Sequence, residues 1–122
     1  MFTKKPTICA GAMSGTSMDG VDGAQIMTDG ENILEFGPTL YNAYSEQEKS
    51  VLLGALGKWA DDDELEEAYD IIHLRHIEVL SQFPQAELFG FHGQTLAHDP
   101  KGQRTHQLGD GKVLAHALRR PV

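Results

Sequence analysis

Residues 13–22 combine residue types and a spacing that could bind phosphate. They read Met-Ser-Gly-Thr-Ser-Met-Asp-Gly-Val-Asp, between apolar runs at 7–13 and 23–27. Gly15 and Gly20 lack the Cβ atoms that would hold a phosphate away from the backbone. Hydroxyls and carboxylates stand between and beside these glycines, namely Ser14, Thr16, Ser17, Asp19 and Asp22. The segment therefore favours a hairpin turn that presents N–H and O–H donors to an anion, with Mg²⁺ held by the two acids through water. A polar turn without a ligand is the alternative.

A second polar stretch follows the buried strand that the apolar run 86–91 predicts. Open α/β sheets place their ligands where parallel strands end. The side chains there mix donors and acceptors, which suits a polyhydroxylated ligand; they are His92, Gln94, Thr95 and Gln107. The alternative is that they only satisfy loop backbone and cap the following helix.

The same stretch is rich in histidine and aspartate, which raises the alternative of a small metal-dependent hydrolase. Its ligands would be His92, His98, His106 and Asp110. The spacing does not match a zinc signature such as His-Glu-x-x-His, and no cysteine is near.

The composition limits the class of protein. A chain of 122 residues makes one domain at most, and 40% hydrophobic with 23% charged residues is ordinary for a soluble globular protein. The net charge of −8 argues against nucleic acid as a partner. Cys9 is the single cysteine, so no internal disulfide forms, and no apolar run reaches membrane-spanning length. We expect a cytoplasmic protein with neither a nucleic-acid nor a membrane partner.

The first half of the chain predicts an antiparallel meander followed by a helix. Strands are expected at 7–13, at 23–27 and at 33–36, the last continuing through 39–44 after Gly37-Pro38. Ser45 with Glu48 is a capping box, which predicts a short helix that ends at Gly57.

The second half predicts helices that alternate with parallel strands. A longer helix is expected to begin within the acidic residues 61–64 and to end before Pro84, with an apolar stripe at Leu65, Tyr69, Ile72, His76, Val79 and Phe83. His76 is interpreted as a packing residue, and His73, on the flank, is given no role. After the strand at 86–91, Asp110 caps a last helix, and Pro121-Val122 begins a further strand. The predicted fold class is α/β, with a mixed sheet and flanking helices.

Taken together, the motifs resemble the anhydro-N-acetylmuramic acid kinases of bacterial cell-wall recycling. The matching pieces are residues 11–22, the His-Gly-Gln-Thr of 92–95 and the Gln-Leu-Gly-Asp of 107–110, and their order and separation fit across essentially the whole chain. The resemblance implies an N-terminal lobe, ribonuclease-H-like, of the actin-like and hexokinase-like ATPase superfamily. Enzymes of this superfamily bind ATP in a cleft between two lobes. The kinases of the resembled family open the 1,6-anhydro ring with water and phosphorylate the sugar's 6-oxygen, which gives N-acetylmuramic acid 6-phosphate.

Carried onto this sequence, the resemblance assigns two sets of residues. The ATP-binding hairpin would be Gly15, Thr16, Ser17, Met18, Asp19, Gly20, Val21 and Asp22. The sugar side of the cleft would be His92, Gln94, Thr95, Gln107 and Asp110. It further implies ATP with Mg²⁺ as cofactors and a homodimer.

The chain departs from the pattern in two ways. Met13 stands where much of the superfamily has an aspartate, so the carboxylate work falls to Asp19 or Asp22. Family members are expected to be roughly three times longer, with the catalytic base on an Asp-Phe-Arg segment beyond Val122 and a second lobe after it. We therefore expect a fragment without kinase activity of its own; a non-catalytic binding module is the alternative.

Overall fold

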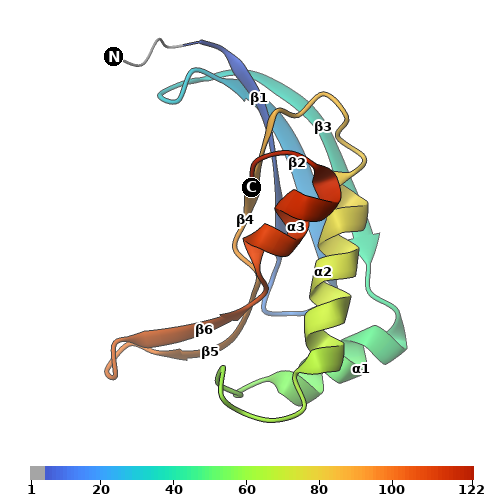
Figure 1. Cartoon of the computed structure of the whole chain (residues 1–122), viewed down its shortest axis with the longest axis vertical. Helices are drawn as coiled ribbons and strands as arrows, with labels where there is room; N and C mark the ends of the chain where they lie inside the picture. Colours follow the sequence, from blue (N-terminus) through green and yellow to red (C-terminus); the bar gives the residue numbers. More distant parts are fainter. Residues whose placement is uncertain (1–4) are drawn as a thin grey trace.

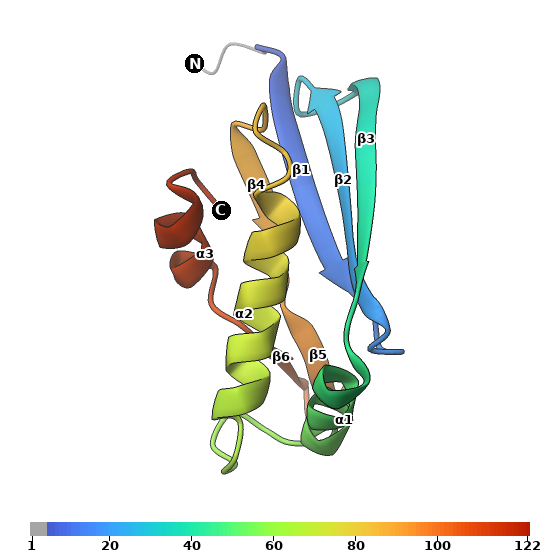
Figure 2. The ribbon, with the colours of Figure 1, turned by 90° about the vertical axis from the view of Figure 1, so that its right-hand side faces the viewer.

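Residues 5–122 are described in a computed structural model as a mixed four-stranded sheet with helices on one face (Figures 1 and 2). The strands β1 (Thr7–Ser14), β2 (Gly20–Thr28) and β3 (Ile33–Ala43) form an antiparallel meander. β4 (Leu88–Phe91) then pairs with β1 in parallel, which gives the order β3-β2-β1-β4. The α/β class and the mixed sheet are confirmed.

The predicted helix starts at Ser45 and Asp110 are confirmed. α1 (Glu46–Ala55) begins with a complete capping box, in which the Ser45 hydroxyl accepts from the Glu48 amide at 3.1 Å and Glu48 accepts from the Ser45 amide at 2.9 Å. α3 (Gly111–Leu118) begins at Asp110, whose Oδ1 accepts from the Lys112 amide at 2.9 Å. These short polar side chains replace the partners that the first helical amides lack.

The prediction that the longer helix begins within 61–64 is wrong. α2 is Glu66–Leu80, and the acidic residues before it form a turn of their own. Asp62 accepts from the Trp59 amide at 2.6 Å through its side chain, while its own amide donates to the Trp59 carbonyl at 2.9 Å. Glu64 then has a left-handed φ of 64°, which a helix does not allow. Aspartate competes with the helix by bonding nearby backbone, and here that local turn wins.

The polar stretch after β4 is a second small sheet where loops were expected. β5 (Gln94–Asp99) and β6 (Arg104–Leu108) pair as an antiparallel hairpin that projects from the main sheet (Figure 1). Asp99 Oδ1 accepts from the Gly102 amide at 3.0 Å and closes the turn. The buried side of the hairpin is formed by Leu96, His106 and Leu108. Several parallel strands were predicted, and the described residues contain one, although the Pro121 carbonyl accepts from the Phe89 amide at 3.0 Å beside the outer edge of β4.

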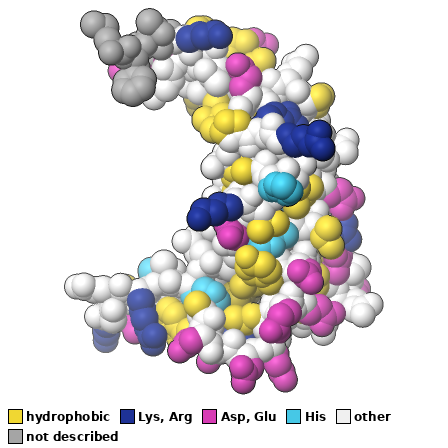
Figure 3. All heavy atoms as spheres, in the orientation of Figure 1, with side chains coloured by type: hydrophobic (Ala, Val, Ile, Leu, Met, Phe, Trp, Pro, Cys, Tyr) yellow, Lys and Arg dark blue, Asp and Glu magenta, His cyan; other side chains and the backbone are white. Residues whose placement is uncertain are grey.

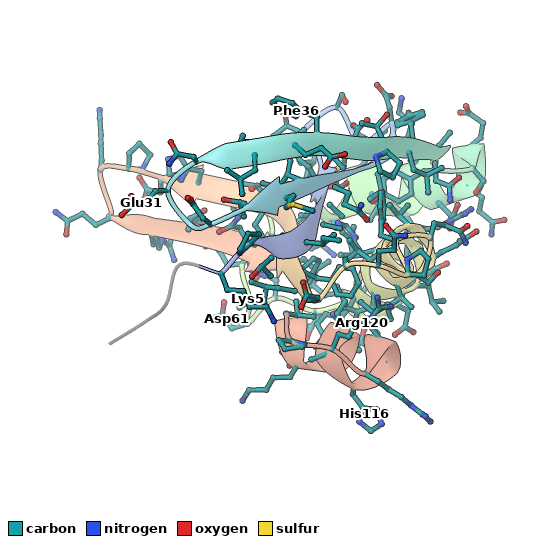
Figure 4. The ribbon with its side chains drawn as sticks, turned by 90° about the horizontal axis from the view of Figure 1, so that it is seen from above. Lys5, Glu31, Phe36, Asp61, His116 and Arg120 are labelled. Atoms are coloured by element: carbon teal, nitrogen blue, oxygen red, sulfur yellow. The ribbon has the colours of Figure 1, made fainter. Side chains whose placement is uncertain are left out.

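The core lies between α2 and the sheet. The predicted stripe is confirmed within α2, because Ile72, His76 and Val79 have no exposed surface. Its two end members, Leu65 and Phe83, lie outside the helix. The helix approaches β2 closely at Gly23, where an added Cβ would lie 2.6 Å from Val79 Cγ1. The other face of the sheet carries no helix among residues 5–122, and Phe36, 78% exposed, lies on the side of the sheet away from α3 (Figure 4).

Replacing Gly23 with alanine should therefore destabilise the fold. The new methyl group would collide with the side chains of Val79 and Phe83, and overpacking of this kind costs about 1–3 kcal/mol. Gly11→Ala is the matched control, since its Cβ would meet its nearest neighbour, the Gly90 carbonyl oxygen, at an ordinary 3.8 Å. Urea denaturation of both variants measures the difference. Equal stability of the two variants would show that the packing of α2 against β2 does not require glycine at position 23.

A charged pair joins α1 to α2. Arg75 donates to both carboxylate oxygens of Glu48, Nη2 to Oε1 at 2.5 Å and Nε to Oε2 at 2.8 Å. These hydrogen bonds from Arg75, helped by the bond from the Ser45 amide, lower the pKa of Glu48 from its ordinary 4.5 to about 2. Two parallel charge-assisted bonds also fix the angle between the two side chains.

The stability of the fold should consequently fall as the pH drops from about 4.5 to about 2, because folding lowers the pKa of Glu48. In Glu48→Gln the amide can still accept from Ser45, but the charge is gone. We expect this variant to be less stable by roughly 1–2 kcal/mol above about pH 5, and to have a flatter acid profile. Glu46→Gln, an exposed residue of the same first turn, is the control. Thermal melts at stepped pH test this, and parallel profiles for the parent protein and Glu48→Gln would refute it.

Candidate functional site

The connection between β1 and β2 is an exposed turn with free backbone donors. The Met18 amide donates to the Gly15 carbonyl at 3.0 Å and closes the turn. Thr16 and Ser17 at its tip are exposed, and within residues 5–122 their amides donate to no other protein group. Two adjacent free N–H groups on one turn are suited to bind an anion.

The turn is fixed from beneath by the core. Met18 is fully buried although its φ of 55° lies in the left-handed region, so packing of its side chain compensates for the backbone strain. Gly20 lies so close to β3 that an added Cβ would be 2.4 Å from the Asn42 carbonyl oxygen. The Tyr44 amide donates to the Asp19 carbonyl at 2.9 Å. The turn is thus held on both sides.

A buried hydrogen-bond network joins the turn to the start of β5. Ser14, at the end of β1, donates through its hydroxyl to Gln94 Oε1 and lies 2.8 Å from the Tyr44 hydroxyl. Gln94 Nε2 donates to the Gly15 carbonyl at 3.2 Å. Gln94 has no exposed surface, and burial raises the pKa of Tyr44, which keeps its hydroxyl protonated as a donor. The first and second polar motifs are therefore in direct contact.

The residues predicted to bind ATP fall into an exposed group and a buried group. Thr16 and Ser17 lie at the exposed tip, and an added Cβ at Gly15 would have no neighbour closer than 4.0 Å, so the backbone there is open. The side chains of Met18 and Val21 are fully buried. Any contact of these two residues with a nucleotide would use their backbone atoms.

The two predicted magnesium ligands differ in their surroundings. Asp19 is 57% exposed and its Oδ1 lies 2.6 Å from Lys49 Nζ, in α1. The hydrogen bond from Lys49, with a second from Ser17, lowers the pKa of Asp19. Asp22 is exposed on the sheet face that carries no helix. Both carboxylates are exposed and can be reached from solvent, which fits contact with a hydrated cation.

The segments around the second and third motifs cross in close contact. Gly109 has a φ of 134°, and an added Cβ there would be 2.6 Å from Phe91 Cζ and 3.5 Å from Gly93 Cα. Thr95 and Gln107 are directly opposite each other in the β5–β6 pair. Glycine at both crossing points lets the strand ends approach, so 92–95 and 107–110 form one surface.

The predicted sugar residues face different spaces on this surface. His92 lines a hollow of about 740 Å³ on the uncovered sheet face, together with Met13, Asp22 and Tyr41. Gln107 lines a second hollow of about 560 Å³, which it shares with Tyr69 and acidic residues of α2 and the preceding loop. Acidic side chains gather over that lower end of α2 (Figure 3).

The histidines do not form a metal site. Among residues 5–122 no three His, Cys, Asp or Glu side chains are placed to hold a metal ion. His106 is buried and its Nδ1 lies 2.7 Å from the Lys58 carbonyl oxygen, whereas His98 is exposed. The hydrolase alternative therefore has no geometric basis in this part of the chain.

One residue near the site was missed by sequence reasoning. His73, on α2, is 5% exposed, and its Nε2 accepts from the Asp110 amide at 2.8 Å. The apolar periodicity gave no signal for this contact, because the partner is a backbone group 37 residues away.

Comparison with known proteins identifies the family. The sequence model described as anhydro-N-acetylmuramic acid kinase matches residues 7–122. The chain belongs to this family. Relatives of the same name are 56% identical over 112 residues in Cereibacter sphaeroides, 53% over 117 residues in Ruegeria sp. and 37% over 123 residues in Paramagnetospirillum magneticum. These matches cover 92%, 96% and 94% of this chain.

The chain spans about a third of the length of these family members, namely 30%, 31% and 34%. Its mixed sheet with flanking helices is consistent with an actin-like ATPase lobe, as the resemblance implies. In the part of the chain that the structure describes, no helix is long and apolar enough to cross a membrane.

The Gln94 network should be needed to hold the phosphate turn. In Gln94→Leu, the Ser14 hydroxyl keeps only Tyr44 as a partner and the Gly15 carbonyl keeps only the Met18 amide, and each hydrogen bond lost beneath the turn costs about 0.5–1.5 kcal/mol. Gln107→Leu makes the same change at an exposed position. Chemical denaturation and the amide resonances of Thr16 and Ser17 measure the effect. If Gln94→Leu and Gln107→Leu had the same stability and the same Thr16 and Ser17 resonances, the hydrogen bonds of Gln94 would not be needed to hold the turn.

Proposed function

We propose that this chain is the N-terminal, phosphate-binding lobe of an ATP-dependent kinase that acts on 1,6-anhydro-N-acetylmuramic acid in cell-wall recycling. The observation that carries the proposal is the exposed turn at 15–18, whose Thr16 and Ser17 amides donate to no group of residues 5–122 and whose base is fixed by Met18 and Gln94. Membership of the kinase family supports it. Cytoplasmic location and a homodimer are expected with it.

The turn would bind the transferring end of the triphosphate. Its two amides can donate to an anion without a charged side chain, so phosphate binding is compatible with a chain of net charge −8. Because the turn is held before any ligand arrives, its donors need little reorganisation during phosphoryl transfer.

Asp19 and Asp22 would hold Mg²⁺ through its water ligands. When bound, Mg²⁺ neutralises charge that develops on the phosphoryl oxygens. Lys49 Nζ contacts Oδ1 of Asp19, and the carboxylate, 57% exposed, can also accept from a water molecule of the ion. Lys49 would thus orient this carboxylate.

The sugar would lie against the surface formed by 92–95 and 107–110. His92, Thr95 and Gln107 offer side-chain groups for hydroxyls, while Gln94 supports the surface from below and Asp110 caps α3. In the proposed reaction water adds to the anomeric carbon and gives up a proton to the general base, and the bond from that carbon to the bridging oxygen breaks. This oxygen, now the sugar's 6-oxygen, takes the γ-phosphoryl group as the bond between the β- and γ-phosphates of ATP breaks and ADP leaves.

We assign the general base that activates the water to none of the described residues. We expect it, and the adenosine-binding lobe, in the larger part of the family members that this chain does not span. The chain by itself should accordingly transfer no phosphate. Incubation with ATP, Mg²⁺ and the anhydro-sugar, followed by detection of a sugar 6-phosphate, tests this, and any product would contradict it.

Binding of triphosphate to the turn can be tested on the chain itself. In an NMR titration with MgATP, the Thr16 and Ser17 amides should shift first and most. Gly15→Val should abolish these shifts and leave the fold intact, because the new side chain meets open space but stands where a phosphate would approach. Gly54→Val, at a glycine of α1 that also has open space, is the control. Unchanged shifts in Gly15→Val would rule out the turn as the phosphate site.

A further inference from the structure

His73 is a buried histidine whose protonation state is fixed by its partner. The Asp110 amide lies 2.8 Å from Nε2 and can only donate, so Nε2 is an unprotonated acceptor and the proton of the neutral ring is on Nδ1. The ring is 5% exposed and packs edge-on against Tyr69, with 4.1 Å between ring centroids. Both the ring's orientation and its tautomer are therefore determined.

The hydrogen bond is made where the chain turns from β6 into α3. Asp110 is the N-cap of α3, and the preceding Gly109 is packed against Phe91. The bond to His73 therefore ties the loop of residues 107–110 to the middle of α2. A helix amide that would otherwise need water or a side-chain cap receives an imidazole acceptor from another element.

We propose that neutral His73 is the positioning residue that holds the loop 107–110 against α2, through the hydrogen bond from the Asp110 amide to its Nε2. The importance of this loop for the sugar rests on the function proposed above, but the anchoring itself does not. Protonation of His73 would replace the acceptor with a second N–H group that faces the Asp110 amide, so the bond would be lost and the loop released.

The surroundings favour the neutral ring. Burial lowers the pKa of His73 below its ordinary value of 6.5, and the carboxylates of Asp110 and Asp70 oppose this shift. His76, one turn further along α2, is also neutral, since burial lowers its pKa to about 4. The anchor should consequently be complete at neutral pH and fail only when the solution is acidic enough to protonate His73, below the ordinary range of a histidine.

Nitrogen-15 NMR of the intact chain tests the anchor directly. At neutral pH, His73 Nε2 should have the chemical shift of an unprotonated nitrogen, and the Asp110 amide should be protected from hydrogen exchange. Acidification below about pH 6.5 should shift Nε2 and reduce the protection factor of Asp110 in parallel. A protonated Nε2 at neutral pH, or Asp110 protection that does not follow the titration, would overturn the proposal.

Variants separate anchoring from general packing. His73→Leu should lower the Asp110 protection factor by about tenfold or more and remove its pH dependence. His73→Gln, whose amide oxygen can accept the bond, should restore protection without the titration. His116→Leu, at an exposed position of α3, should change neither. Unaltered Asp110 protection in a folded His73→Leu protein would refute the anchor.

If His73→Leu does not fold, the titration of the parent protein still decides the question. None of these measurements needs ATP or sugar. A failed nucleotide titration would therefore remove the proposed function and leave the anchor standing, whereas a failed anchor would leave the phosphate turn untouched.

Discussion

The structure depends on the buried hydrogen bonds that Gln94 makes beneath the turn between β1 and β2. One amide side chain accepts from Ser14 and donates to the Gly15 carbonyl, so it satisfies polar groups on both sides of the point where β1 ends. Polar groups without water are stable only when each has a partner. The chain can therefore keep its turn amides outside, at Thr16 and Ser17, because the groups below them are already paired.

The same network explains why distant motifs meet. β4 lies parallel to β1, so the strand that leads to residue 92 ends at the same edge as the strand that leads to residue 15. Gly93 and Gly109 then let the two connections cross with no side chain between them. The residues predicted to contact phosphate and those predicted to contact sugar thus lie near each other because two parallel strands end at the same edge of the sheet.

How much of this could be read from the sequence depended on whether the signal was local. The caps at Ser45 and Asp110 and the stripe on α2 were predicted, since each involves residues a few positions apart. The start of α2 was wrong, because Asp62 closes a turn with Trp59 that competes with the helix. The β5–β6 hairpin was missed, although Asp-Pro-Lys-Gly at 99–102 was a turn signal that could have indicated it.

For the candidate site, the sequence predicted which residues lie near one another. It did not predict which of them are exposed to a ligand and which support the site from the interior. Gln94 was assigned to the sugar by its donors and acceptors, and the structure places those atoms in the protein interior; contact with the sugar stays a prediction. His73 had no assignment, because its partner is a backbone amide 37 residues away. Contacts of this kind depend on tertiary packing, and no periodicity along the chain encodes them.

The chain has a net charge of −8, and the turn explains how it could still bind the proposed anionic ligand. Asp19 is the carboxylate nearest the turn in sequence, and Lys49 pairs with it at 2.6 Å. An exposed pair of this kind adds little to stability. Its consequence is electrostatic, because the lysine offsets a negative charge that would otherwise stand beside the free amides. The donors that remain are backbone dipoles, which attract phosphate locally without a cationic side chain. Their position depends on the turn staying where Gln94 and Met18 hold it.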